Sequence, residues 1–308
     1  MSEPQSTVAL GLWPLAGITT IGVTRKDAEA TLATAIDHGI TTFDTAYSYG
    51  YQGESDLLLS RFLGRHRHRY RIISKVGQRW TNQKVRVING RPEQLTLDAE
   101  TTLTRLGIES LDLLMLHSPD PNLPIEESTR ALCKLHQRGL CESIGACNLS
   151  FDQLTRVHQV ASEECTPLAA IQCPLNVMQR EAQEDIIRNA HRIGIHAHVY
   201  WTLMKGLLAG RIQRDHQFQQ GDSRPSYEIF QGEPRERAHR IVDAFSRLSK
   251  EINSSPARLA IGWALSQPGV EHALVGARYP EQVSDIAKAR PLDSEILNRV
   301  EQITTEMT

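Results

Sequence analysis

The sequence contains no uninterrupted apolar run that approaches the ~20 residues of a membrane-spanning helix. Residues 1–7 are polar and lack the apolar core of a secretory signal peptide. We therefore expect no membrane span and no membrane partner, and we expect the protein to be cytoplasmic.

Cysteine is also scarce, and neither sign of charge is in large excess. The five cysteines are odd in number and include no Cys-x-x-Cys pair, so a disulfide framework or a structural zinc site is not expected. The 34 lysines and arginines nearly balance the 36 aspartates and glutamates. This balance gives no electrostatic reason to expect nucleic acid as a partner, and the one basic run, residues 65–71, is interpreted as a solvated loop.

What the sequence does contain is a regular alternation of apolar, strand-like segments with segments of helical period. Eight such strand and helix units, without an early Gly-x-Gly-x-x-Gly turn, favour a single α/β (β/α)8 TIM barrel over an open doubly wound sheet. We expect residues 1–308 to form one domain. Residues 78–90 and 211–234 are too long to be simple connectors, so they are predicted to be long loops that cover the substrate site at the C-terminal face of the barrel. The predicted strands are 8–14, a segment ending at Asp44, 70–74, 111–116, 142–146, 168–172, 195–200 and 272–275.

Four ionisable residues lie at or just beyond three successive predicted strand ends: Asp44 and Tyr49, Lys75, and His117. The carboxyl ends of parallel strands meet at one edge, so these side chains are expected to converge. Tyr49 would donate a proton to a carbonyl oxygen, with its pKa lowered by the Lys75 ammonium, and Asp44 would be the counter-charge of Lys75. His117 would donate to, or relay protons for, the same oxygen. None of these groups supplies a hydride, so a nicotinamide or flavin cofactor is required.

The chain resembles the aldo-keto reductase family from about residue 8 to residue 289. The resemblance rests on six motifs in the family's order: FDTAYSYG at 43–50, ISKVG at 73–77, LDLLMLH at 111–117, IGACNLS at 144–150, YWTLMKGLLAG at 200–210 and VGARYPEQV at 275–283. It implies that Tyr49 is the general acid, that Lys75 and Asp44 tune it, and that His117 orients the substrate carbonyl.

The resemblance also implies NADP(H) as the cofactor. Asp44, Cys147, Asn148 and Gln172 would lie at the nicotinamide end, where Asn148 and Gln172 would hold the carboxamide. Tyr200 would stack on the ring, and Trp201, the next residue, would also bind the cofactor. Backbone of the segment with Leu203, Gly206 and Leu207 would wrap the pyrophosphate, and Gly276, Arg278 and Gln282 would grip the adenosine end. The sequence departs from the family pattern at Cys147, where serine is usual, at Trp201 and Thr202, which replace Ser-Pro, and at Asp285 and Ile286, near which an adenine-binding asparagine is common.

The expected activity is NADPH-dependent reduction of aldehydes or ketones, with a small carbonyl compound or sugar as the partner. Trp13, Tyr49, Trp80 and His117 are expected to bind substrate, and Tyr51 and Trp201 are further candidates for the pocket wall. The alternatives are an aldose or cyclitol dehydrogenase that works in the oxidative direction, and a cofactor-sensing partner protein. No metal is expected, because ligands such as Cys147, Cys173 and His117 would compete with the nicotinamide pocket. The sequence leaves the oligomeric state open.

Overall fold

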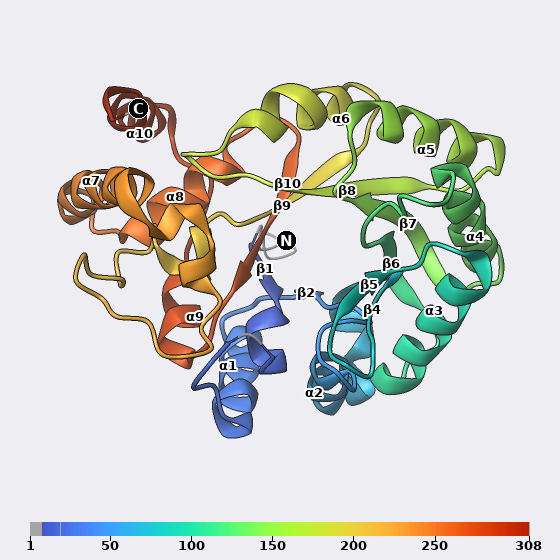
Figure 1. Ribbon diagram of the computed structural model, residues 1–308. Coiled ribbons are helices and arrows are strands. Elements are labelled where there is room, and N and C mark those ends of the chain that lie inside the picture. The colour runs from blue at the N-terminus through green and yellow to red at the C-terminus, as the bar shows by residue number, and fades with distance from the viewer. Residues whose placement is uncertain (1–7, 19, 308) are drawn as a thin grey trace.

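Eight parallel strands form a closed barrel in the computed structural model, which describes residues 8–18 and 20–307. Their order around the barrel is β1-β10-β9-β8-β7-β6-β3-β2, and helices surround the ring of strands (Figure 1). The predicted (β/α)8 architecture is therefore confirmed. The barrel strands are β1 Val8–Gly11, β2 Thr42–Asp44, β3 Arg71–Val76, β6 Leu111–Leu116, β7 Cys141–Cys147, β8 Leu168–Pro174, β9 His196–Tyr200 and β10 Val270–Gly276.

The outer helices begin and end at the residues that favour helix termini. In α1 the Thr24 side chain accepts a hydrogen bond from the Asp27 backbone N–H, and the Asp27 carboxylate accepts one from the Thr24 backbone N–H, so the two residues form a capping box. Pro92 occupies the first turn of α3, and Gly107 ends that helix in the left-handed conformation. The α-helices are α1 Arg25–Asp37, α2 Glu54–Leu63, α3 Pro92–Leu106, α4 Ile125–Gln137, α5 Phe151–Glu163, α6 Arg188–Arg192, α7 Gly232–Glu251, α8 Pro256–Leu265, α9 Pro280–Ile286 and α10 Ser294–Glu306.

The barrel interior is filled by side chains and does not form a channel. Ile73, Leu113, Met115, Cys147 and Ala170 form a buried cluster of their own, separate from the larger clusters that contain the helices. At Gly145 a Cβ atom would lie 2.5 Å from the Ala170 carbonyl oxygen and 2.6 Å from Met115 Cε, so only glycine fits there. The packed interior gives the site above it a rigid floor.

Several boundaries differ from the sequence-based predictions. The strand predicted over 8–14 ends at Gly11, and Trp13–Ala16 form a 3-10 turn, because Pro14 fixes its own φ and has no N–H for a strand ladder. Part of the loop predicted over 78–90 is an antiparallel hairpin of β4, Gln78–Trp80, and β5, Arg86–Ile88. Between β8 and β9 residues 181–192 are helical, but a π-turn, Gln183–Ile187, interrupts the helix before the short α6. Within the described part of the chain, no helix is both long enough and apolar enough to cross a membrane.

Candidate active site

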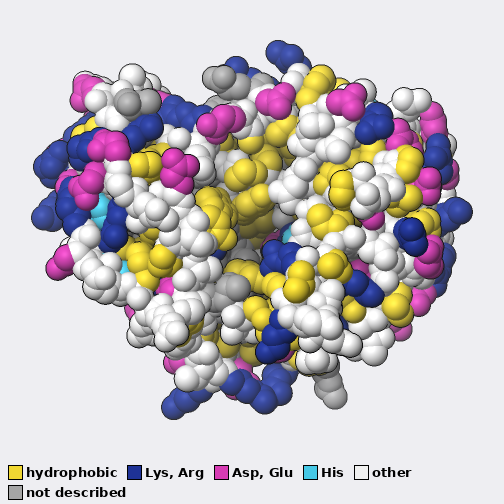
Figure 2. Space-filling view, viewed as in Figure 1, with side chains coloured by type: hydrophobic (Ala, Val, Ile, Leu, Met, Phe, Trp, Pro, Cys, Tyr) yellow, Lys and Arg dark blue, Asp and Glu magenta, His cyan; other side chains and the backbone are white. Residues whose placement is uncertain are grey.

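A cavity of about 700 Å³ opens at the carboxyl ends of the barrel strands. Figure 2 shows the hollow near the centre of this face, with apolar side chains inside it and Lys and Arg side chains at its edge. Active sites of (β/α)8 barrels lie at this end. Every barrel strand contributes to the cavity a residue within two positions of its carboxyl end: Gly11, Asp44, Lys75, His117, Cys147, Gln172, Tyr200 and Gly276.

Lys75 connects two of the predicted catalytic side chains. Its Nζ atom donates to Asp44 Oδ2 at 2.6 Å, to the Thr45 carbonyl oxygen at 3.0 Å and to the Tyr49 hydroxyl at 3.1 Å. All three N–H groups of the ammonium thus have partners, although the side chain is almost completely buried. The structure therefore brings Asp44, Tyr49 and Lys75 into direct contact.

Burial controls the ionisation of the phenol. It raises the pKa of Tyr49 to about 12, although the Lys75 ammonium acts to lower it. The sequence-based prediction of a lowered pKa is therefore wrong in sign, because loss of solvent outweighs the attraction of the ammonium. For Lys75, burial acts to lower the pKa, but Asp44 and then Tyr49 offset it and hold the pKa above its ordinary value. Tyr49 is consequently a protonated donor, and Lys75 a cation, at neutral pH.

His117 lies beside Tyr49 at the end of β6. The two rings meet edge to face with their centres 5.9 Å apart, and His117 Nδ1 lies 3.5 Å from Ser48 Oγ. Burial, reinforced by the charges of Lys75 and Arg86, holds the pKa of His117 well below its ordinary value. The imidazole is therefore neutral at neutral pH, with one nitrogen able to donate a hydrogen bond.

The predicted nicotinamide-binding residues form a hydrogen-bonded wall beside Asp44. Gln172 Nε2 donates to Asp44 Oδ1 at 2.7 Å, and the Tyr200 hydroxyl donates to Asn148 Oδ1 at 2.6 Å. Cys147 Sγ lies 3.6 Å from Gln172 Oε1, and burial raises the pKa of this thiol, so it is uncharged. These contacts orient planar amide and aromatic groups along one side of the cavity.

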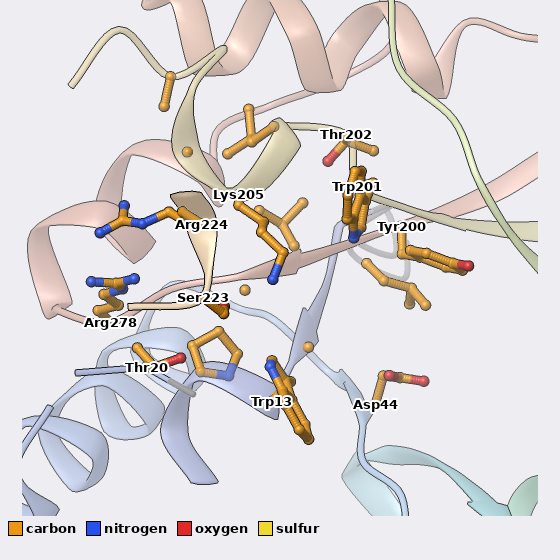
Figure 3. Close-up of a pocket in the computed structure, with 18 of the residues that line it drawn as sticks. Trp13, Thr20, Asp44, Tyr200, Trp201, Thr202, Lys205, Ser223, Arg224 and Arg278 are labelled. Carbon is orange, nitrogen blue, oxygen red and sulfur yellow. The ribbon is translucent and has the colours of Figure 1, made fainter. Parts of the chain in front are cut away.

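The segment after β9 has an unusual backbone. Trp201, Met204 and Lys205 have φ values of +64°, +46° and +53°. Non-glycine residues in this region cost of order 1 to 3 kcal/mol each and concentrate at ligand sites. The Lys205 ammonium lies 4.3 Å from the centre of the Tyr227 ring, and both side chains line the cavity. The strained segment thus places the Lys205 ammonium in the elongated cavity, between Asp44 at one end and Arg278 at the other (Figure 3).

A second group of cations lies at the far end of the groove. Figure 3 shows Arg224 and Arg278 with Ser223 and Thr20 on the side of the pocket away from Asp44. Arg224 Nη2 pairs with Asp222 Oδ2 at 2.5 Å, whereas no carboxylate of the described residues forms an ion pair with Arg278. The backbone N–H of Arg278 donates to Gln282 Oε1 at 2.7 Å, and this hydrogen bond fixes the turn before α9. This end of the groove therefore presents guanidinium groups that suit a phosphate.

Most of the residues selected from the sequence line this cavity, but Leu207, Trp80 and Tyr51 do not. The Tyr51 ring meets the Trp80 ring edge to face, with the ring centres 5.2 Å apart. The side chain of Leu207 is fully buried in the core, so only its backbone is available to a ligand. Trp80 stands behind the cavity wall, where its indole N–H donates to the Ser48 carbonyl at 2.9 Å. The residues that line the cavity as expected are Trp13, Asp44, Tyr49, Lys75, His117, Cys147, Asn148, Gln172, Tyr200, Trp201, Leu203, Gly206, Gly276, Arg278 and Gln282.

Sequence reasoning missed several cations and polar groups of the cavity, because they lie in loops or in very short elements whose sequence shows no helical or strand period. The missed residues are Thr20, Arg86, Lys205, Arg211, Asp222, Ser223, Arg224 and Tyr227.

Asp285 is one of the positions at which the sequence departs from the family pattern. Its carboxylate accepts hydrogen bonds from Ser255 Oγ at 2.8 and 3.0 Å and pairs with Arg258 at 3.2 Å. Its carboxylate is thus occupied in joining α9 to α8.

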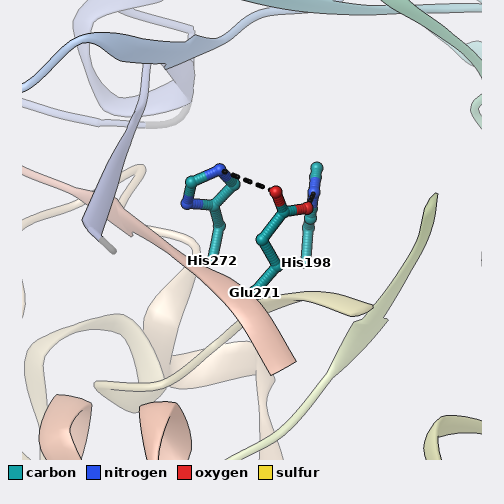
Figure 4. A group of neighbouring side chains, drawn as sticks. All are labelled: His198, Glu271 and His272. Atoms are coloured by element: carbon teal, nitrogen blue, oxygen red, sulfur yellow. Dashed lines mark hydrogen bonds and ion pairs between the residues drawn. The ribbon is translucent and has the colours of Figure 1, made fainter. Parts of the chain in front are cut away.

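A cluster of two histidines and a glutamate lies elsewhere in the barrel, on β9 and β10 (Figure 4). Glu271 Oε2 accepts from His198 Nε2 at 2.9 Å, and Oε1 accepts from Arg71 Nη1 at 3.0 Å and lies 3.8 Å from His272 Nε2. The hydrogen bond from His198 is the main reason why the pKa of Glu271 lies below its ordinary value. Arg71 begins β3 and Glu271 is the second residue of β10. The cluster is therefore explained as an ionic network near the amino ends of these strands, at the end of the barrel opposite the cavity.

Comparison with known proteins agrees with this arrangement. Residues 7–305 match the model of the aldo/keto reductase family. The aldo-keto reductase YhdN of Bacillus subtilis is 31% identical, over 92% of this chain and 84% of its own length. A protein of Schizosaccharomyces pombe named as a putative voltage-gated potassium channel subunit beta is 28% identical, over 97% of this chain and 91% of its own length. The solved structure of the glycerol dehydrogenase AKR11B4 from Gluconobacter oxydans superposes with a TM-score of 0.89 at 32% identity, over 100% of this chain and 94% of that chain. The chain therefore belongs to the aldo/keto reductase family, a family of oxidoreductases that act on carbonyl and alcohol groups and generally use nicotinamide cofactors.

Proposed function

We propose that this protein reduces aldehydes or ketones to alcohols with NADPH. The observation that carries the proposal is the contact between Tyr49 and Lys75. The phenol oxygen lies 3.1 Å from an ammonium that is itself paired with Asp44 at 2.6 Å, in a cavity wide enough for a substrate and an extended cofactor. Such an arrangement provides a proton donor whose conjugate base is stabilised in place.

In this proposal Tyr49 is the general acid. Its protonated hydroxyl donates to the carbonyl oxygen of the substrate as the hydride reaches the carbon. The Lys75 ammonium stabilises the resulting phenolate, and Asp44 keeps Lys75 charged despite its burial. The neutral imidazole of His117 donates a hydrogen bond to the same oxygen and thereby orients the carbonyl.

The hydride comes from a bound reduced nicotinamide, because none of these side chains can supply it. Tyr200, Asn148 and Gln172 would hold the nicotinamide end, and Lys205 would lie beside the pyrophosphate. Arg278 and Arg224 would hold the adenosine end. Two guanidinium groups at that end, one without a carboxylate partner among the described residues, fit a 2′-phosphate and are the reason to favour NADPH over NADH.

The test is the Tyr49→Phe variant. We expect it to lose NADPH oxidation with a panel of aldehydes and ketones, while the fluorescence titration of NADPH remains as in the wild type. The matched control is Tyr47→Phe, because the Tyr47 ring lies between Arg79 and Arg105 and does not line the cavity. Unchanged turnover in Tyr49→Phe would refute the assignment of the acid.

A second candidate is oxidation of polyols or sugars, since AKR11B4 carries the name of a glycerol dehydrogenase. Reduction of NADP⁺ with glycerol and cyclitols, compared with NADPH oxidation by the corresponding carbonyl compounds, separates the two directions. A non-catalytic cofactor sensor is less well supported, because all four candidate catalytic side chains are present in one cavity. Tight NADPH binding without turnover in either direction would favour the sensor.

A further inference from the structure

Arg86 is a cation of the cavity that has no role in the proposed reaction. It lies on β5, directly opposite Trp80 of β4 in the hairpin register. Its guanidinium carbon lies 4.6 Å from the centre of the Trp80 ring and 5.0 Å from that of Trp13. Two indole rings therefore hold the guanidinium group, although Arg86 keeps contact with solvent.

The same two tryptophans fix Arg86 beside the proposed acid. Trp80 donates its indole N–H to the Ser48 carbonyl, next to Tyr49, at 2.9 Å. The Trp13 ring meets the Tyr49 ring edge to face at 5.2 Å. The charge of Arg86 is close enough to contribute to the low pKa of His117. The guanidinium thus lies near the Tyr49 and His117 pair, whereas Arg224 and Arg278 lie on the side of the pocket away from Asp44 (Figure 3).

Arg86 lacks a counter-charge of the kind that Lys75 has. Lys75 is paired with Asp44, but no carboxylate among the residues described by the structure forms an ion pair with Arg86. Because Tyr49 and His117 are neutral and the Lys75 and Asp44 charges cancel, Arg86 carries the net charge of this part of the cavity. A guanidinium that stacks through its faces keeps the N–H groups at its edge available to an anion.

We propose that Arg86 is an oxyanion-binding subsite, and that the preferred substrates are aldehydes or ketones that also carry a carboxylate or a phosphate ester. This inference rests on the proposed function of the same cavity and names its substrate class. A planar guanidinium binds either group through two parallel hydrogen bonds, and each is stronger than a bond between neutral groups. A neutral substrate would gain nothing from Arg86.

The experiment compares matched substrates in the wild type and in Arg86→Met, which keeps an unbranched side chain and removes the charge. One pair is 4-carboxybenzaldehyde and its methyl ester, and the other is glyceraldehyde 3-phosphate and glyceraldehyde. We expect kcat/KM for the anionic member to fall about 10- to 100-fold, mainly through KM, and that for the neutral member to change less than about twofold. The substrate pair whose anionic member loses more kcat/KM in Arg86→Met shows whether the subsite prefers a carboxylate or a phosphate.

Two further variants make the result specific. Arg86→Lys keeps the positive charge but cannot form the two parallel hydrogen bonds of a guanidinium, so it should restore part of the preference for anionic substrates. Lys84→Met is the matched control, because Lys84 is a cation of the same hairpin that lies 4.7 Å from the centre of the Tyr51 ring and does not line the cavity. It should leave both substrate pairs unchanged. An equal loss for charged and neutral substrates in Arg86→Met, or an equal loss of NADPH affinity, would overturn the inference.

Binding of terephthalate, which cannot be reduced, separates this inference from the proposed function. We expect it to quench the tryptophan fluorescence of the wild type and to lose affinity in Arg86→Met. If that difference is seen and no carbonyl compound is turned over, the subsite stands and the proposed function fails. If neutral carbonyl compounds are reduced, but terephthalate does not bind and anions are not preferred, the subsite alone is refuted.

Discussion

The Nζ atom of Lys75 lies 2.6 Å from Oδ2 of Asp44, and each of the two residues is only 2% exposed. Two opposite charges held away from water in this way lose hydration, which their attraction and the added hydrogen bonds from Lys75 to Thr45 and Tyr49 must offset. The stability and the proposed chemistry of the site therefore depend on the same pair.

Asp44→Asn is expected to destabilise the protein and abolish carbonyl reduction, since it leaves Lys75 buried without a counter-charge. Removal of one partner of a buried ion pair costs about 3 to 5 kcal/mol, and urea unfolding measures this loss. The double variant Asp44→Asn with Lys75→Met should regain most of the stability without activity. If Asp44→Asn alone unfolds at the same urea midpoint as the wild type, the Asp44 and Lys75 pair does not contribute to the stability of the site.

Asp56 should make the stability of the fold depend on pH. Its fully buried carboxyl accepts a 2.6 Å hydrogen bond from Thr45, and burial raises its pKa from 3.8 to about 7. The native state holds this proton more tightly than the unfolded chain, so the stabilisation is complete below pH 3.8 and is lost as the pH rises to about 7.

Asp56→Asn keeps an acceptor for Thr45 and cannot ionise. We expect this variant to be more stable than the wild type at about pH 8, by a few kcal/mol at most, and the advantage to shrink at about pH 5. Urea midpoints at the two pH values measure the effect. A constant difference between variant and wild type would mean that Asp56 does not titrate in this range.

Glu271→Gln tests the ionic network at the opposite end of the barrel. The variant removes the charge that Arg71 and His198 contact at 3.0 and 2.9 Å, so a loss of about 1 to 3 kcal/mol is expected at neutral pH. Because the pKa of Glu271 is depressed in the folded state, its contribution is present above the ordinary value of 4.5 and is lost as the pH falls below it. The kcat and KM values should not change.

The control for Glu271 is Glu251→Gln, which disrupts an ion pair with Arg299 whose two side chains are 57% and 40% exposed. Exposed pairs contribute between about 0 and 1 kcal/mol, so this variant should unfold close to the wild-type midpoint. Equal effects of the two substitutions would argue against a special role for the network.

Arg278→Met tests the preference for NADPH. Loss of a guanidinium that contacts the 2′-phosphate should weaken NADPH binding about 10- to 100-fold, and it should change NADH binding little, because NADH lacks that phosphate. Fluorescence titrations with both cofactors measure the ratio. A parallel loss for NADPH and NADH would place Arg278 elsewhere on the cofactor.

The regular elements of the barrel could be predicted because their signals are local. The apolar run at β6, Leu111–Leu116, and the caps of α1 and α3 mark their own boundaries. The hairpin of β4 and β5 has no comparable signal, since each strand has three residues and β5 is mostly exposed. The contact of Trp80 with the Ser48 carbonyl holds it in place, and this contact joins residues that are 32 positions apart.

The alternation of strands and helices, and the ionisable residues at three strand ends, were set by the sequence alone, because hydrophobic period and turn residues act over short distances. Those features are sufficient to predict a barrel and to select Asp44, Tyr49, Lys75 and His117. Only the tertiary structure decided that burial raises the pKa of Tyr49, and that Arg86 lies between two tryptophans without a carboxylate partner in the described part of the chain. Both properties depend on which distant segments exclude water or supply charge around a side chain, and no local pattern encodes them.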